Sequence, residues 1–328
     1  MSWVELEISS EALRGNPLGD PSVRPVFVWT PPGYDGGGER LPSVYVLHAM
    51  LGQARSWFNV SPFSPNLPQR IEELSLGAVI VLVDGFTSLG GAQWIDSPAI
   101  GSYGRYLCDE VVSFVDERFR TAPEAAHRGI AGKSSGGFGA AFWSMRRPDL
   151  FGGLASHAGD ALFEVTLAAE LAVATQALRN LYQGSFEKFW SDFRSGRPVL
   201  GNATDALLQN VYATAAAFSP GSDGSVELPF RLDTGELVPG VFARWLALDP
   251  VWLAADHAEA VRGMRAIWID AGRHDEYRLD LAAVALRDAL AAAGAAAEAL
   301  RFELFEGGHR GIDHRLALSL AYLVERLS

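Results

Sequence analysis

One short segment restricts the possible folds of this chain more than any other. Residues 132–136 read Gly-Lys-Ser-Ser-Gly, a G-x-S-x-G pattern that follows the apolar run 128–131 and precedes the small-residue run 136–141. A strand that turns sharply into a helix, with a serine at the turn, has this order of residues. Glycine two positions before and two positions after the serine prevents side chains from colliding in so tight a turn. An ordinary glycine-rich turn is the alternative, and the flanking runs count against it.

The serine of this turn is the candidate nucleophile. Ser134 would sit in strained backbone geometry at the start of a helix, whose N-terminus favours negative charge that develops during a reaction. Ser135 would take this role only if the register shifted by one residue, and the spacing of the glycines argues against such a shift. The backbone N–H of Ser135 is better suited to form half of an oxyanion hole.

The rest of the chain alternates between strand-like and helix-like segments. Two strand-like runs, 4–8 and 23–29, come first. Short and mostly apolar runs, typical of buried parallel strands, then occur at 43–48, 78–83, 128–131, 151–156, 264–270 and 299–305. Helical patterns occur at 103–119, 279–293 and 312–327. Repeated strand–helix units predict a doubly wound, mainly parallel sheet, and the serine turn makes it an α/β-hydrolase fold.

Residues 160–256 interrupt this alternation. The interval contains helix-like stretches at 163–182, 185–193 and 205–218, and then a segment, 219–239, rich in glycine, proline and serine. A single crossover between neighbouring strands needs far fewer residues. We therefore predict a hydrolase core made of residues 1–159 and 257–328, with 160–256 inserted as a mostly helical cap over the pocket.

A serine nucleophile needs a base, and the base needs an acid that orients it. In this fold the chain order is serine, acid, histidine. His309 follows the last predicted strand in the sequence Glu-Gly-Gly-His, and its two glycines permit a close turn. We predict that His309 is the base. His314 lies on the first turn of the final predicted helix, where a surface or supporting role is expected.

The acid is expected after the penultimate strand, where the candidates are Asp270, Asp275 and Glu276. Asp270 ends the apolar run, so its side chain should follow the pleat of the sheet. Asp275 lies beyond Gly272, at the edge where catalytic residues of open α/β sheets gather. Glu276 would be a looser partner because its side chain is longer. Asp275 is therefore the predicted acid, and the alternative is that it only caps the next helix.

The second donor of the oxyanion hole is expected in the loop after an early strand. The sequence His-Ala-Met-Leu-Gly at 48–52 follows such a strand, and the backbone N–H of Met50 is the candidate donor. Two correctly aimed donors contribute roughly 3 kcal/mol each to stabilising the transition state of acyl transfer.

Three side chains are candidates for the substrate pocket. Trp94 lies in the loop after the strand 78–83, a loop that borders the active site in this fold. His157 ends the strand beside the nucleophile strand, and His274 neighbours the predicted acid. Loop packing is the alternative for Trp94, and a hydrogen-bonded position in the core is the alternative for His157.

Composition and charge exclude several other classes of protein. The 328 residues carry a net charge of -12, which repels nucleic acid and anionic lipid headgroups. Cys108 is the single cysteine, so no intrachain disulfide can form. The N-terminal residues lack the pattern of a secretory signal, and no apolar run reaches 18 residues, so we expect a cytoplasmic enzyme with no membrane partner. No metal-ligand spacing or nucleotide-binding glycine loop occurs, so no cofactor or metal is expected.

Five stretches of the chain resemble a family of α/β-hydrolase esterases that includes esterase D (S-formylglutathione hydrolase), enterochelin esterases, feruloyl esterases and mycolyltransferases. They read VYVLHAMLGQARSWF, VDGF, GKSSGGFGAAF, IDAGRHDEY and FEGGHRGIDHR. The resemblance implies a triad of Ser134, Asp275 and His309 and an oxyanion N–H at Met50. The chain departs from the family pattern at Ala49, where glycine is usual, at Ser135, where methionine is frequent, and in its long insertion.

Several functions are compatible with these residues, and peptidase or thioesterase activity is among them because a triad does not encode the leaving group. Hydrolysis of a small carboxylic ester through an acyl-enzyme is the leading hypothesis. Acyl transfer to an alcohol or sugar would use the same triad with a different acceptor. A non-catalytic binding protein on the same fold is a third possibility, against which the intact set of Ser134, Asp275 and His309 argues.

Overall fold

The structure is a computed structural model that describes residues 2–195 and 203–328. Its main sheet has eight strands in the order β1-β2-β4-β3-β7-β8-β9-β10. β1 and β2 pair antiparallel to their neighbours, and the remaining strands run parallel. The strands are β1 (Ser2–Ser9), β2 (Val23–Thr30), β3 (Ser43–Leu47), β4 (Val79–Val83), β7 (Arg128–Lys133), β8 (Gly153–His157), β9 (Ala266–Gly272) and β10 (Leu300–Phe305), and a small ribbon is formed by β5 (Asp96–Ser97) and β6 (Gly101–Ser102).

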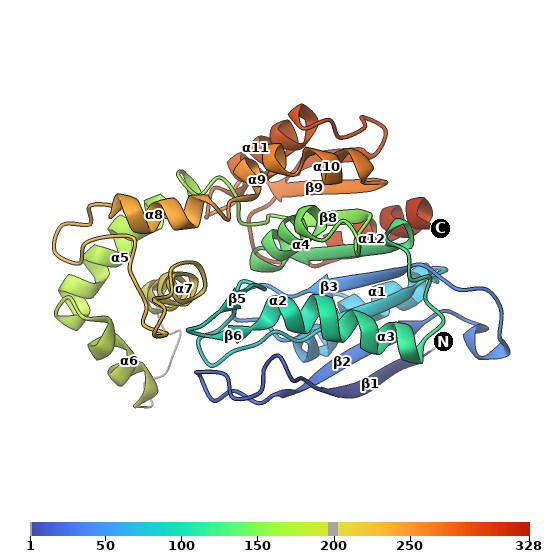
Figure 1. Ribbon diagram of the computed structural model, residues 1–328, viewed down its shortest axis with the longest axis horizontal. Helices are drawn as coiled ribbons and strands as arrows, with labels where there is room; N and C mark the ends of the chain where they lie inside the picture. The colour runs from blue at the N-terminus through green and yellow to red at the C-terminus, as the bar shows by residue number, and fades with distance from the viewer. Residues whose placement is uncertain (1, 196–202) are drawn as a thin grey trace.

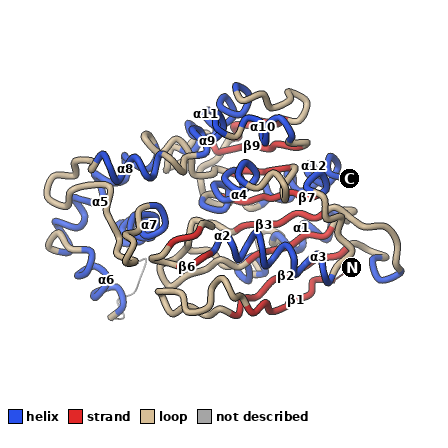
Figure 2. The backbone as a smooth tube through the Cα atoms, viewed as in Figure 1, coloured by secondary structure: helices blue, strands red, loops and turns tan. Residues whose placement is uncertain are grey.

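Helices cover both faces of the sheet, which confirms the predicted α/β-hydrolase fold (Figures 1 and 2). One face carries α1 and α12, and the other carries α4 and α11 among others. The helices are α1 (Leu67–Leu74), α2 (Tyr103–Arg105), α3 (Val112–Arg118), α4 (Ser135–Arg146), α5 (Thr166–Tyr182), α6 (Phe186–Arg194), α7 (Ala203–Phe218), α8 (Pro239–Leu246), α9 (Pro250–Asp256), α10 (Ala258–Gly263), α11 (Leu279–Ala292) and α12 (His314–Leu327).

The alternation of side chains along each strand divides the core into two layers. In β3, Val44 and Val46 belong to the layer beneath α1 and α12, whereas Tyr45 and Leu47 belong to the layer beneath α4. All five residues of β3 are buried, as expected for a central parallel strand. No helix in the described part of the chain is long and apolar enough to cross a membrane.

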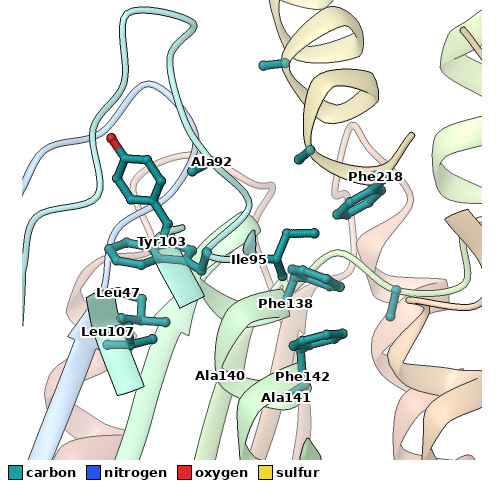
Figure 3. Packing of buried hydrophobic residues seen from close by; sticks show 14 of the residues in the cluster. Leu47, Ala92, Ile95, Tyr103, Leu107, Phe138, Ala140, Ala141, Phe142 and Phe218 are labelled. Carbon is teal, nitrogen blue, oxygen red and sulfur yellow. The ribbon is translucent and has the colours of Figure 1, made fainter. Parts of the chain in front are cut away.

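The predicted insertion begins with helices α5 to α8, which form a group of their own at one end of the molecule (Figure 1). α7 packs against β5, and Phe218 at its end lies against Phe138 of α4 and Phe163, with ring centroids 5.3 and 5.5 Å away (Figure 3). α9 instead packs against α4 and α11, so the predicted insertion 160–256 includes one helix that lies on the core. Residues 196–202 of the insertion lie outside the described residues.

Candidate active site

The turn between β7 and α4 has the geometry that the glycine spacing predicts. Ser134 is the N-cap of α4 and adopts φ 55° and ψ -124°, a conformation that a residue with a side chain seldom takes. A Cβ added at Gly132 would overlap the backbone of Gly136, and one added at Gly136 would overlap the carbonyl oxygen of Leu47. The close approach of α4 to the sheet therefore requires both glycines, and the strained serine lies where β7 ends.

A histidine and a carboxylate face each other in the loops that follow β10 and β9. Nδ1 of His309 lies 2.9 Å from Oδ2 of Asp275, and both residues are buried. Oδ1 of the same carboxylate accepts hydrogen bonds from the backbone N–H groups of Tyr277 at 2.9 Å and Leu279 at 3.3 Å. Asp275 thus lies beside His309 and also accepts the N–H of Leu279, the first residue of α11, although the N-cap position of that helix is Arg278.

Glu276 holds the backbone of the histidine loop rather than the ring. Its Oε2 accepts the N–H of His309 at 2.7 Å, and this hydrogen bond is the main cause that lowers the pKa of the Glu276 carboxyl. The loop also lies so close to β9 that a Cβ on Gly272 would overlap the carbonyl oxygen of Gly307. The glycines on both sides of the contact let the two loops meet.

Asp270 belongs to a separate network inside the core. It binds Nδ1 of His157 at 2.6 Å, and its other oxygen accepts from Nε1 of Trp268 at 2.8 Å and from Nε of Arg315 at 2.9 Å. Nε2 of His157 lies 2.7 Å from the hydroxyl of Ser319. Both ring nitrogens of His157 are therefore engaged in the core, which is the alternative that the sequence left open for this residue.

The loop after β3 presents backbone N–H groups near the serine turn. The N–H of Leu51 donates to the carbonyl of Gly90 at 2.7 Å, whereas the N–H of Met50 has no acceptor among the residues that the structure describes. The N–H of Ser135, the first residue of α4, lacks an intrahelical acceptor because of its position. Met50 and Ser135 therefore keep the free donors that were predicted for an oxyanion hole.

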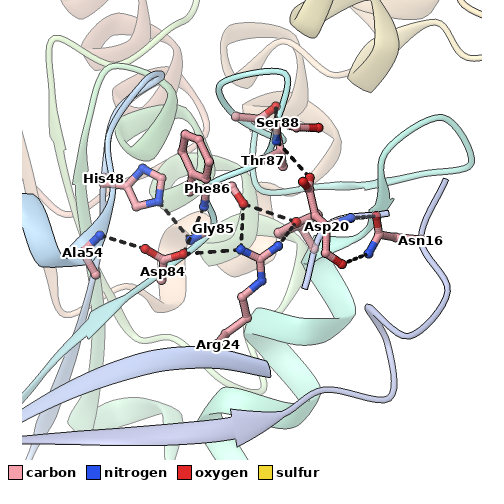
Figure 4. A network of polar contacts seen from close by, with 12 residues as sticks. Asn16, Asp20, Arg24, His48, Ala54, Asp84, Gly85, Phe86, Thr87 and Ser88 are labelled. Atoms are coloured by element: carbon pink, nitrogen blue, oxygen red, sulfur yellow. Dashed lines mark hydrogen bonds and ion pairs between the residues drawn. The ribbon is translucent and has the colours of Figure 1, made fainter. Parts of the chain in front are cut away.

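His48 anchors this loop, a role that the sequence analysis did not predict (Figure 4). Its Nε2 accepts the N–H of Gly85 at 2.9 Å, and its Nδ1 lies 2.9 Å from the carbonyl oxygen of Ala49. Burial lowers the pKa of the His48 imidazole, which favours the neutral ring that this pattern requires. Beside it, Asp84 accepts the N–H of Ala54 at 3.0 Å and pairs with Arg24 at 3.6 Å.

Trp94 and His274, two of the predicted pocket residues, make other contacts. Trp94 is 3% exposed, and its Nε1 donates to the carbonyl of His48 at 3.1 Å, so it supports the loop that carries Met50. His274 is exposed and lies 3.4 Å from Glu306 at the surface. Contacts of Trp94 and His274 with a substrate remain predictions.

Asp160 is a second carboxyl group beside the serine, and no motif in the sequence marks it. Its backbone N–H lies 3.4 Å from the carbonyl oxygen of Ser134. Burial raises the pKa of the Asp160 carboxyl to about 6, whereas His309 and the polar side chains of Gln93 and Ser134 lower it. The neighbouring charge of Asp275 adds to the increase. Asp160 is therefore electrostatically coupled to all three predicted triad residues.

Asp160→Asn is expected to stabilise the protein at pH 8. A folded-state pKa of about 6, above the ordinary value of 3.8 for an aspartate, means that ionisation of this carboxyl disfavours folding increasingly as the pH rises between these values. An amide removes that cost, which amounts to about 1–3 kcal/mol above pH 6. Urea denaturation of both proteins should show this gain at pH 8 and almost none near pH 4. An equal gain at both pH values would contradict the assignment.

No group of three or more histidine, cysteine, aspartate or glutamate residues in the described part of the chain is arranged to hold a metal ion.

Solved structures similar to this chain share its fold at low sequence identity. A ferulic acid esterase is 16% identical with a TM-score of 0.60, and 100% of this chain and 98% of that chain are covered. An S-formylglutathione hydrolase from Agrobacterium tumefaciens is 16% identical with a TM-score of 0.61, with 99% and 95% covered. The fluorophosphonate-binding serine hydrolase F of Staphylococcus aureus is 14% identical with a TM-score of 0.60, with 98% of each covered. A search of curated proteins finds no match.

A family model identifies the chain at the level of sequence. The model described as "Putative esterase" matches residues 21–318, which include the serine turn, the insertion and both loops that carry the facing carboxylate and histidine. The match covers most of the 328 residues. The chain therefore belongs to this esterase family and is a carboxylic ester hydrolase.

Proposed function

We propose that the protein hydrolyses a small carboxylic ester through an acyl-enzyme, with Ser134 as nucleophile, His309 as general base and Asp275 as the acid that orients the base. The observation that carries this proposal is the contact of 2.9 Å between His309 and Asp275, in loops at the same edge of the sheet as the strained Ser134. Carboxyl ends of neighbouring parallel strands meet at one edge, where catalytic residues of open α/β sheets gather.

The proposed reaction proceeds in two displacements. Nε2 of His309 removes the proton of the Ser134 hydroxyl as its oxygen attacks the ester carbonyl, and the N–H groups of Met50 and Ser135 stabilise the oxyanion. The imidazolium then gives its proton to the departing alcohol, which leaves an acyl group on Ser134. Water, activated by the same imidazole, attacks the acyl-enzyme, and the carboxylic acid departs as the serine recovers its proton.

Asp275 supports this reaction by fixing one tautomer of His309. Its carboxylate accepts a hydrogen bond from the Nδ1–H of His309, which leaves Nε2 free to act as a base, and it stabilises the imidazolium that forms. The two backbone N–H groups that bind its other oxygen keep the carboxylate in place. The hydrogen bond from the His309 N–H to Glu276 fixes the loop in turn.

Purified protein is expected to hydrolyse p-nitrophenyl esters, with a dependence on acyl length that reports the size of the pocket. Release of p-nitrophenol should be measured over a series from acetate to long-chain esters, with His314→Ala as a matched control for His309→Ala. We expect the control to retain activity and His309→Ala to lose it. Retention by His309→Ala together with loss by His314→Ala would contradict the assignment of the base. Adding an alcohol and measuring the partition of products would separate hydrolysis from acyl transfer.

A further inference from the structure

The carboxyl group of Asp160 is beside the proposed nucleophile but has no place in the proposed triad. Asp275 already binds Nδ1 of His309, so a second orienting acid is not needed. Asp160 nevertheless interacts with His309 and Ser134, and the residue as a whole is intermediate between buried and exposed. Its position next to the reacting serine therefore suits contact with a substrate.

The loop that carries Asp160 is held in strained geometry. Ala158 and Leu162, on either side of it, have positive φ values of 43° and 54°. The buried carboxylate of Asp249 fixes this loop by accepting the N–H groups of Leu162 at 3.0 Å and Phe163 at 2.6 Å. Such conformations cost of order 1–3 kcal/mol each and persist where surrounding contacts impose them, commonly at functional sites.

Gln93 approaches the same carboxyl group from another loop and is also strained. Gln93 and its neighbour Trp94 have φ values of 50° and 59°. The Nε2 of Gln93 donates to the hydroxyl of Thr214 in α7 at 3.1 Å, so the insertion helps to position it. Two loops and a helix of the insertion thus meet around Asp160 and Ser134.

In the part of the chain that the structure describes, no lysine or arginine side chain forms an ion pair with Asp160. None of the ion pairs found among residues 2–195 and 203–328 includes Asp160, whereas the buried carboxylate of Asp270 in β9 pairs with Arg315 at 2.9 Å. Charged groups withdrawn from water are normally paired, because desolvation of an unpaired charge is costly. A cationic group on a bound molecule would supply the missing partner.

We propose that Asp160 is a specificity residue whose carboxylate pairs with a cationic group, such as an ammonium, close to the scissile bond of the ester. This inference rests on the proposed function. The net charge of -12 would in addition favour the approach of a cationic substrate over that of an anionic one.

Two pairs of esters that differ only in charge test this proposal. The first pair is acetylcholine and its uncharged isostere, in which a tert-butyl group replaces the trimethylammonium group of the alcohol. The second pair is the p-nitrophenyl ester of a butyrate with a terminal trimethylammonium group, and its tert-butyl isostere. The measured quantity is the ratio of kcat/KM for the charged ester to kcat/KM for the neutral ester, within each pair at pH 8. Both esters of a pair depend on the triad in the same way, so any effect of a variant on the triad cancels in this ratio.

The wild type should prefer the charged ester at least tenfold in one of the pairs, and Asp160→Asn should bring that ratio close to one. Glu164→Gln is the matched control, because it removes the same charge from an exposed residue of the same loop. Its ratio should equal that of the wild type. No preference in either pair, or a preference that survives in Asp160→Asn, would overturn the proposal.

A second readout needs no variant. The preference of the wild type should decrease as the pH falls from 8 to 5, because the Asp160 carboxyl has a pKa of about 6 and loses its charge over this range. His309 and Asp275 also interact with this carboxyl. A change in their protonation affects hydrolysis of the charged and the neutral ester equally, so it does not alter the ratio. A ratio that does not change with pH would contradict the role of Asp160. Failure to hydrolyse either neutral ester would instead refute the proposed function.

Discussion

Asp275→Asn is expected to lower kcat by about 10⁴-fold and to leave the fold intact, as the equivalent change does in a trypsin-like triad. One oxygen of the Asp275 carboxylate lies 2.9 Å from Nδ1 of His309, where it can accept a hydrogen bond from that nitrogen. The side-chain amide of asparagine can instead donate an N–H to Nδ1. This stabilises the tautomer of His309 that carries its proton on Nε2, and a protonated Nε2 cannot act as a base. Ester hydrolysis and circular dichroism of the same preparation would test both parts of the expectation.

Asp270→Asn is the matched control, because it makes the same chemical change five residues earlier in the chain, within β9. It would weaken the contacts with His157 and Arg315 in the core, and breaking a buried ion pair costs about 3 kcal/mol or more. We therefore expect lower stability in urea and a kcat that falls far less than in Asp275→Asn. A folded but inactive Asp270→Asn protein beside a nearly fully active Asp275→Asn protein would place the acid at the end of β9 and contradict the account.

Ser134→Ala is expected to lower kcat by about 10⁶-fold, the loss found when the nucleophile of a subtilisin-type triad is removed. Alanine keeps the Cβ of serine, so the turn with φ 55° should form as before. Ser135→Ala is the matched control, because it also removes a hydroxyl but retains the backbone N–H proposed for the oxyanion hole. Comparable losses of kcat in the two variants would contradict the assignment of Ser134.

The fold could be predicted because the strands and the turn carry strong local signals. The mostly apolar runs at 43–48 and 78–83 form fully buried strands near the sheet centre, and glycines 132 and 136 are required by backbone contacts that tolerate no Cβ. Asp275 and His309 could be paired in advance because both follow parallel strands that end at the same edge. For the strands, the serine turn and the acid–histidine pair, the local sequence and the topology of the sheet predicted the same structure.

The pocket could be predicted far less well, because its residues depend on how distant loops fold against each other. Trp94 and His157 look like pocket residues from their places after strands, yet each satisfies its polar atoms inside the protein. Asp160 lies in a short loop without a motif, and only the meeting of this loop with Gln93 and His309 shows its setting. The insertion likewise ends in α9, which packs against α4 and α11 of the core, and no signal in the sequence separates it from the rest of the insertion.

Reaction with a fluorophosphonate, followed by mass spectrometry of the digested protein, tests the central claim most directly. The reagent modifies a serine that a neighbouring base has activated, and the mass of the modified peptide fragments identifies the residue. We expect a single adduct on Ser134 in the wild type, with little labelling of His309→Ala. An adduct on Ser135, or no adduct in a folded protein that still hydrolyses esters, would contradict it.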